Sequence, residues 1–162
     1  MYDLRGYGGM LSDEGRIAAF HQSIRAAVQP GSLVLELGTA TGLMAFWAAQ
    51  AGARHVHAVE PEAAIALARQ SARDNGFAER ITFHQTVSSH LTLPERADVL
   101  IEDMRGAMPC FKTHLPDVMD ARARLLTPDA ILICQRDTLL VTVAESEKQS
   151  RHVHAPWDGH RW

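Results

Sequence analysis

The chain has 162 residues, the length of a single domain, and its formal net charge at pH 7 is −3. Such a small excess of charge gives no large basic surface, which argues against nucleic acid or an anionic membrane as the main partner. Cys110 and Cys134 are the only cysteines and lack metal-ligand spacing, so we expect free thiols in a cytoplasmic protein. The sequence has no signal-peptide pattern and no bilayer-spanning apolar run, so we expect no membrane partner.

The first ten residues are rich in glycine and aromatic side chains, and we expect a flexible arm or a lid over a ligand rather than a regular helix. A helix should follow Ser12, a good N-cap, because apolar residues recur at helical spacing from Ile17 to Val28. Arg16 lies in its first turn, where the helix dipole disfavours a cation. Binding of a carboxylate would explain this arginine, and plain solvation is the alternative.

A buried strand is predicted at 34–37, followed by a tight loop of small residues and a helix over 42–51. A strand that turns through glycines into a helix N-terminus is how an open α/β sheet holds a nucleotide. The spacing departs from the dinucleotide fingerprint G-x-G-x-x-G, because Ala40 and Leu43 occupy its second and third glycine positions. Glu36, near the strand end, is placed to face a cationic ligand tail. The alternative is a strand-turn-helix without a ligand.

Alternating residues predict a second strand over 55–60, which ends in Glu60 roughly 20 positions after the loop. An acid at that spacing accepts hydrogen bonds from ribose hydroxyls, and a solvated strand end is the alternative. Pro61 is expected to start the next helix. A third strand is predicted over 81–85, and the polar loop after it makes Val87 and Ser88 candidates for contact with a nucleobase.

The fourth strand, expected over 98–103, is mostly apolar and ends in Glu102 and Asp103. Ligands bind beyond the carboxyl ends of such strands, so either carboxylate is a candidate to bind a cationic substrate or take a proton. A salt bridge to Arg105 is the alternative.

The rest of the chain predicts a loop over 106–112, a helix over 115–126, a turn at 127–129, a buried strand at 130–134 and an extended segment at 139–144. Beyond Glu145 the pattern dissolves into polar residues, typical of a linker or frayed end. His152, His154 and His160 lie there without a neighbouring carboxylate, and we predict no metal site.

Together these stretches resemble the S-adenosylmethionine (SAM)-binding domain of class I methyltransferases, and in particular that of protein arginine methyltransferases and their bacterial relatives. The likeness runs from about Tyr7 to about Glu145. Residues 36–42 are similar to the motif E/D-x-G-x-G-x-G, with an alanine in place of one glycine, and residues 10–16 are similar to M-L-x-D-x-x-R. Residues 51–60 are similar to A-G-A-x-x-V-x-x-V-E, and residues 102–106 are similar to S-D-L-R-G of the bacterial relatives.

The resemblance implies an α/β fold, a Rossmann-like three-layer αβα sandwich with a mostly parallel sheet. It implies SAM as cofactor and S-adenosylhomocysteine as product. The cofactor-binding positions it implies are Arg16 and Glu36 for the methionine tail, Gly38, Thr39 and Gly42 for the loop, Glu60 for ribose, and Val87 and Ser88 for adenine. Asp103, with Glu102, is expected to be catalytic and to face the methyl acceptor.

Two departures bear on the acceptor. Arginine methyltransferases hold the guanidinium with two glutamates; the first aligns with Asp103, whereas the second falls at or near Lys112. The family also continues into a β-barrel, most or all of which we expect this chain to lack. We therefore expect residues 1–30 to be an arm and helix that cover the cofactor, 31–144 the SAM-binding domain, and 145–162 a linker, tail or start of a truncated second domain.

The expected function is SAM-dependent methyl transfer to a nucleophile on a protein, arginine-like, or on a small molecule. The main alternative is a non-catalytic or incomplete SAM-binding domain that acts as a subunit or needs a partner region. A nicotinamide-dependent oxidoreductase and a pure interaction module are further alternatives. The acceptor itself is left open, and a homodimer is possible if the missing barrel leaves an apolar surface exposed.

Overall fold

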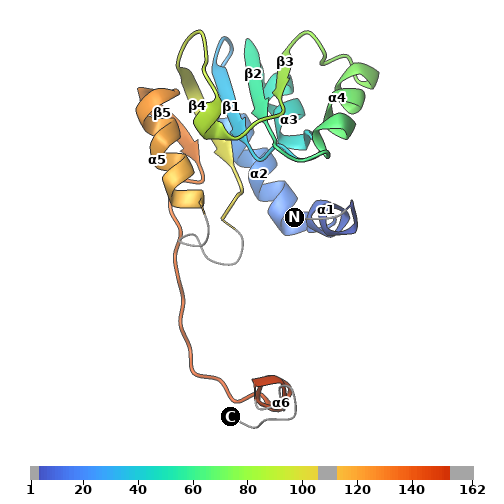
Figure 1. Ribbon diagram of the computed structural model, residues 1–162, viewed down its shortest axis with the longest axis vertical. Coiled ribbons are helices and arrows are strands. Elements are labelled where there is room, and N and C mark those ends of the chain that lie inside the picture. Colours follow the sequence, from blue (N-terminus) through green and yellow to red (C-terminus); the bar gives the residue numbers. More distant parts are fainter. Residues whose placement is uncertain (1–3, 106–112, 154–162) are drawn as a thin grey trace.

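Five parallel strands form the centre of the computed structural model, which describes residues 4–105 and 113–153 (Figure 1). Their order in the sheet is β3-β2-β1-β4-β5, and every pairing is parallel. The elements are α1 (Leu4–Leu11), α2 (Glu14–Ala27), β1 (Leu33–Leu37), α3 (Leu43–Ala51), β2 (His55–Val59), α4 (Ile65–Asp74), β3 (Ile81–His84), the 3-10 turn η1 (Ser88–His90), β4 (Ala97–Glu102), α5 (His114–Arg124), β5 (Leu126–Ile133) and α6 (Glu147–Val153). The expected α/β class and parallel sheet are confirmed.

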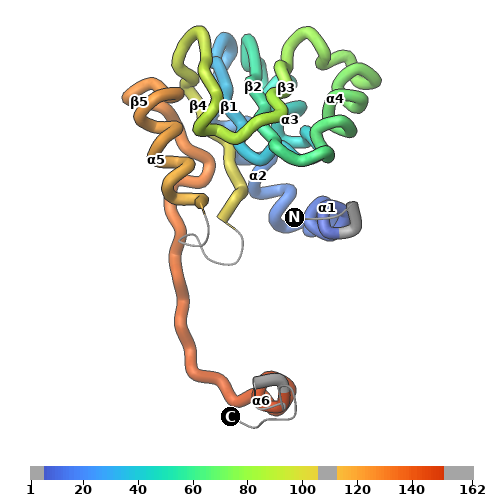
Figure 2. The backbone as a smooth tube through the Cα atoms, viewed as in Figure 1, coloured from blue at the N-terminus to red at the C-terminus, as the bar shows by residue number. Residues whose placement is uncertain are grey.

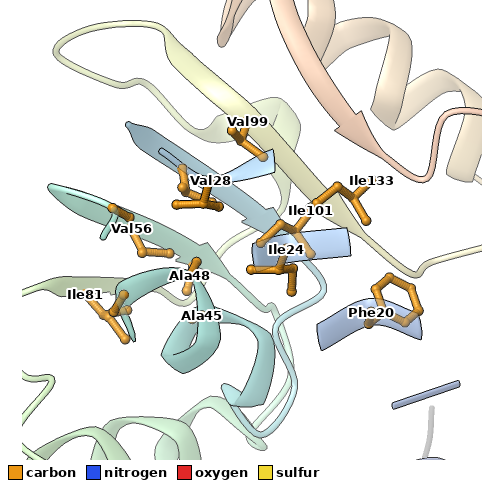
Figure 3. Close-up of a cluster of buried hydrophobic side chains, with 14 residues drawn as sticks. Phe20, Ile24, Val28, Ala45, Ala48, Val56, Ile81, Val99, Ile101 and Ile133 are labelled. Atoms are coloured by element: carbon orange, nitrogen blue, oxygen red, sulfur yellow. The ribbon is translucent and has the colours of Figure 1, made fainter. Parts of the chain in front are cut away.

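Helices cover both faces of the sheet, which explains why the central strands are continuous apolar runs. On one face, α2 and α3 pack against alternate residues of the strands, and Figure 3 shows Phe20 and Ile24 of α2 with Ala45 and Ala48 of α3 in this cluster. On the other face, α5 packs on the intervening residues, including Leu35 and Leu100. Successive side chains of the central strands therefore point alternately into one hydrophobic core and the other.

The chain order places the switch point of the sheet at β1. After β1 the chain moves outward through α3, β2, α4 and β3, and it then returns to β4 on the opposite side of β1. Ligands of open α/β sheets bind at the carboxyl ends of strands at such a reversal. The loop that follows Leu37 and the residues that follow Glu102 therefore meet at this edge, since Leu37 pairs with Glu102.

The N-terminal segment differs from the expectation, because α1 is a helix although Gly6, Gly8 and Gly9 lie within it. Glycine costs about 1 kcal/mol in a helix, so intrinsic propensity does not account for α1. The start of α2 also differs: Asp13 is the N-cap, and its carboxylate accepts a hydrogen bond from the Arg16 backbone N–H at 3.0 Å. Ser12 instead donates from its hydroxyl and its backbone N–H to the carbonyl of Gly8.

Two further boundaries were wrong, and the C-terminal segment agrees with its prediction in part. The helix expected to start at Pro61 begins at Ile65, after a turn. β5 begins at Leu126, before the expected turn, because Ala97 pairs with Leu126 and the register then shifts. The extended segment predicted at 139–144 is present as part of 134–146, which lies outside the sheet and leads to α6, where a linker or frayed end was expected (Figure 2).

None of the helices among the described residues is long and apolar enough to cross a membrane. The expected loop at 106–112, which includes Cys110 and Lys112, lies outside the described residues, as do His154 and His160. Within the described ranges, no three His, Cys, Asp or Glu side chains are grouped so that they could hold a metal ion.

Candidate active site

The loop between β1 and α3 has the backbone conformation that its glycines predict. Gly38 and Gly42 have φ values of +76° and +88°, in the left-handed region that residues with a Cβ rarely adopt. The backbone N–H groups of Gly38 and Thr39 donate to the carbonyl of Val59 at 2.9 and 3.0 Å, which fixes the loop against β2. The N-cap residue Gly42 has no side chain to cap α3, and the Glu36 carboxylate accepts a hydrogen bond from the backbone of Ala45 in the first turn of this helix.

A pocket lies between this loop and the two N-terminal helices. It is open to solvent, and its enclosed volume is about 50 Å³. It brings together Arg16, Glu36 and Thr39, three of the predicted cofactor residues. Its walls are formed by Tyr7, Met10, Leu11, Arg16, Ile17, Glu36, Thr39, Ala40, Thr41, Leu43 and Met44. The glycine-rich segment that was predicted to be non-helical therefore covers the pocket as a helix.

Glu36 is the buried acid of this pocket. Its carboxylate accepts a hydrogen bond from the Thr39 hydroxyl at 2.6 Å. Burial raises the pKa of Glu36 to about 7, an effect that the Thr39 hydrogen bond opposes and the nearby charge of Glu60 reinforces. A carboxylate that is costly to ionise gains most from a cation in the same pocket, so the position suits the ammonium group of an amino-acid tail.

Glu60 lies at the carboxyl end of β2 and supports the glycine loop. One carboxylate oxygen accepts from the backbone N–H of Ala40 at 3.1 Å, and the other accepts from that of Glu62 at 3.0 Å. Glu60 is buried and is not among the residues that line the pocket. A carboxylate has about four acceptor positions, so lone pairs remain for hydroxyl donors of a ligand.

The two predicted adenine contacts lie near η1. Val87 is 43% exposed, whereas Ser88 is buried and its backbone carbonyl accepts from Arg124 at 3.0 Å. Neither residue lines the pocket beside Arg16 and Glu36. The structure brings Arg16, Glu36, Thr39 and the glycines together, and it leaves Glu60, Val87 and Ser88 at neighbouring strand ends.

Arg16 and Asp103 form an ion pair that the sequence did not predict. The Arg16 Nε donates to Asp103 Oδ2 at 3.0 Å, and its Nη2 binds the same oxygen. Both side chains are about one quarter exposed. The residue predicted to hold the cofactor tail therefore contacts the residue predicted to face the acceptor. The two lie 87 positions apart in the sequence, and neither motif indicates that they meet.

Glu102 belongs to a separate, buried network. Its Oε1 pairs with Arg105 at 2.5 Å, and Arg105 also pairs with Asp137 at 3.0 Å. Its Oε2 lies 3.3 Å from Nδ1 of His114, the first residue of α5. The predicted alternative of a salt bridge to Arg105 is therefore correct for Glu102, whereas Asp103 pairs with Arg16. Sequence reasoning missed His114, since a single histidine at a helix start carries no motif.

The residues around the loop have the chemistry that a SAM site needs. The left-handed glycines admit a ligand close to the backbone, and the pocket places the Arg16 guanidinium and the Glu36 carboxyl group together. A parallel sheet with this loop at its switch point is the arrangement of a class I SAM-dependent methyltransferase domain. The chain matches the methyltransferase domain family over residues 34–129, and it belongs to that family.

The chain is similar in sequence to several protein arginine N-methyltransferases. The chain is 37% identical over 125 residues to protein arginine N-methyltransferase PRMT10 of Oryza sativa subsp. japonica, covering 76% of this chain and 33% of that protein. It is 28% identical over 152 residues to protein arginine N-methyltransferase 1 of Chlamydomonas reinhardtii, covering 92% and 44%. The chain thus spans less than half the length of these curated relatives.

Solved structures give the same result. Arabidopsis thaliana protein arginine methyltransferase 10 matches with a TM-score of 0.76 and 30% identity, covering 81% of this chain and 38% of that one. The Trypanosoma brucei PRMT1 enzyme-prozyme heterotetrameric complex with AdoHcy matches with a TM-score of 0.72 and 31% identity, covering 76% and 39%. The expected class, a SAM-dependent methyltransferase domain that resembles arginine methyltransferases, is confirmed.

Proposed function

We propose that the protein to which this chain belongs transfers the methyl group of SAM to a guanidinium nitrogen of an arginine in a protein. The observation that carries this proposal is the carboxylate of Asp103, which follows Glu102 at the end of β4 and binds Arg16 at the wall of the pocket. The arginine methyltransferase relatives support the same acceptor. The cofactor supplies an activated methyl group, and the chain supplies position and charge.

The cofactor roles follow from the charges in the pocket. Arg16 holds the carboxylate of the methionine tail, and Glu36 holds its ammonium group. Gly38, Thr39 and Gly42 shape the loop that the tail approaches. Glu60 accepts hydrogen bonds from the ribose hydroxyls, and Val87 and Ser88 frame adenine. Support for the last three comes from their places at the ends of β2 and β3.

The acceptor role of Asp103 depends on Arg16. A cofactor carboxylate competes with Asp103 for the Arg16 guanidinium, and this competition frees Asp103 for a second cation. The local charges agree: with His114 neutral, the site has three carboxylates (Glu102, Asp103 and Asp137) against two guanidinium groups (Arg16 and Arg105). When the cofactor carboxylate neutralises Arg16, the carboxylates of the site exceed its guanidinium groups by two negative charges. This excess favours a cationic acceptor such as arginine.

The division of the chain is part of the proposal. Residues 1–30 cover the cofactor, which the lining of the pocket by α1 and α2 supports. Residues 31–144 bind SAM, and 145–162 lead away from this domain. We also propose a cytoplasmic protein, which the free thiol of Cys134 supports, and self-association, which the heterotetramer of the Trypanosoma relative supports.

A methyl-transfer assay tests this function. Radiolabelled SAM is supplied with a basic peptide that contains arginine, with its lysine counterpart, or with a free guanidino compound. We expect label on the arginine peptide alone, lost in Asp103→Asn but kept in the control Glu95→Gln, whose side chain forms an exposed ion pair with Arg54. Label on the guanidino compound alone would assign a small-molecule acceptor. Cofactor binding without transfer to any acceptor would favour the non-catalytic alternative.

A further inference from the structure

A buried carboxylate and a buried imidazole face each other where β4 ends and α5 begins. Oε2 of Glu102 lies 3.3 Å from Nδ1 of His114, and each side chain is 4% exposed. Nδ1 of His114 nevertheless has no hydrogen-bond partner. Buried polar groups nearly always have one, so an unpartnered ring nitrogen beside a carboxylate calls for a reason. The arrangement has the components of a charge-assisted hydrogen bond and lacks the bond itself.

The position of this pair relates it to the acceptor. Glu102 is opposite Leu37 in the sheet, and Leu37 directly precedes the glycine loop. The next residue after Glu102 is Asp103, whose carboxylate binds Arg16 at the wall of the cofactor pocket. The Glu102–His114 pair therefore lies one residue along the chain from the carboxylate proposed above to face the methyl acceptor.

The charges around His114 are nearly balanced. From the end of β4 come Glu102 and Arg105, and Asp137, after β5, shares the Arg105 guanidinium. These three groups leave one negative charge beside the imidazole. The N-terminus of α5 adds a partial positive charge, and Asp117 in the first turn of the helix adds a negative one.

We propose that the Glu102–His114 pair takes up the proton that methyl transfer releases, an inference that rests on the proposed function. The acceptor nitrogen forms a bond to the methyl carbon, and the bond from that carbon to sulfur breaks with its electron pair going to sulfur. The acceptor N–H bond then breaks, and its proton passes by way of the Glu102 carboxylate to His114. The imidazolium remains hydrogen-bonded to Glu102 until the proton passes to water. His114 acts through Glu102 and is a positioning residue.

The test compares His114→Gln, which keeps a polar side chain but cannot titrate, with a control variant, His55→Gln, at the start of β2. Methyl transfer to the arginine peptide is measured between pH 6 and 9, together with S-adenosylhomocysteine binding by calorimetry. We expect His114→Gln to lower kcat about 100-fold, the lower end of the usual range for acid–base groups, and to remove the pH dependence that the wild type shows. Cofactor affinity should stay within about twofold. An unchanged kcat and pH profile would overturn the proposal.

A second measurement does not need turnover. The ring of His114 is titrated by NMR in the wild type and in Glu102→Gln, both with S-adenosylhomocysteine bound. If Glu102 and His114 share a proton, the titration midpoint of the ring should fall in Glu102→Gln. An unchanged midpoint would overturn the proposal. His114→Met, an apolar side chain of similar length, replaces His114→Gln if that variant does not fold. If NMR shows that Glu102 and His114 are coupled but the wild type transfers no methyl group, the proposed function is contradicted. There is then no released proton for the pair to take up.

Discussion

Replacing Gly42 with alanine should destabilise the protein by about 1–5 kcal/mol. The φ of +88° costs an alanine about 1–2 kcal/mol. An added Cβ would also lie 3.0 Å from Cβ of Ala68 and 3.0 Å from Cζ of Phe46. Overpacking of this kind costs about 1–3 kcal/mol. The lower chain entropy of unfolded alanine returns about 0.4–1 kcal/mol, so the three contributions sum to about 1–5 kcal/mol.

Gly76→Ala is the matched control. Gly76 has a φ of +76°, and nothing lies within 4 Å of an added Cβ, so it shares the backbone cost without the contact. Urea unfolding followed by circular dichroism should give a loss of about 1 kcal/mol for the control. The excess loss in Gly42→Ala measures the close approach of α3 to α4 that shapes the loop. Equal losses in the two variants would refute this reasoning.

Three further predictions concern charge. Because Glu36 must be ionised to hold an ammonium group and its pKa is about 7, the Kd of S-adenosylhomocysteine should rise by up to about tenfold for each pH unit below 7, and Glu36→Gln should abolish this dependence in calorimetry. Burial lowers the pKa of His57 from 6.5 to about 4, so the unfolded chain binds more protons in that window and stability is lost as pH falls through it. Thermal melts should show a shallower decline in His57→Gln, and identical slopes would count against the assignment. Arg16→Ala should weaken S-adenosylhomocysteine binding at least about tenfold, the value of one charged hydrogen bond, whereas Arg25→Ala, near the exposed end of α2, should leave the Kd unchanged.

The sheet could be predicted because its local signals agree with its tertiary role. Strands buried on both faces are continuous apolar runs, and the turns between them carry glycine or proline. The glycine loop could be predicted for a similar reason, since the left-handed φ of Gly38 and Gly42 is what glycine permits. Acids at the ends of β1, β2 and β4 then follow from the direction of the strands.

The remaining features depend on contacts that have no local signal. α1 forms in spite of its glycines, and Tyr7, Met10 and Leu11 of this helix line the pocket. The pairing of Arg16 with Asp103 joins two motifs that were interpreted separately, one for the cofactor and one for the acceptor. Burial of His114 against Glu102 depends on where α5 docks, which the sequence pattern does not specify.

The most direct test of the central claim is a calorimetric titration of this chain with SAM and with S-adenosylhomocysteine, beside NAD and a Glu60→Ala variant. A SAM-binding domain of the methyltransferase family should bind both sulfur nucleotides with a Kd on the order of micromolar, about −8 kcal/mol. It should bind them more weakly in the variant, and it should not bind NAD. Binding of NAD, or of none of the three, would contradict the account.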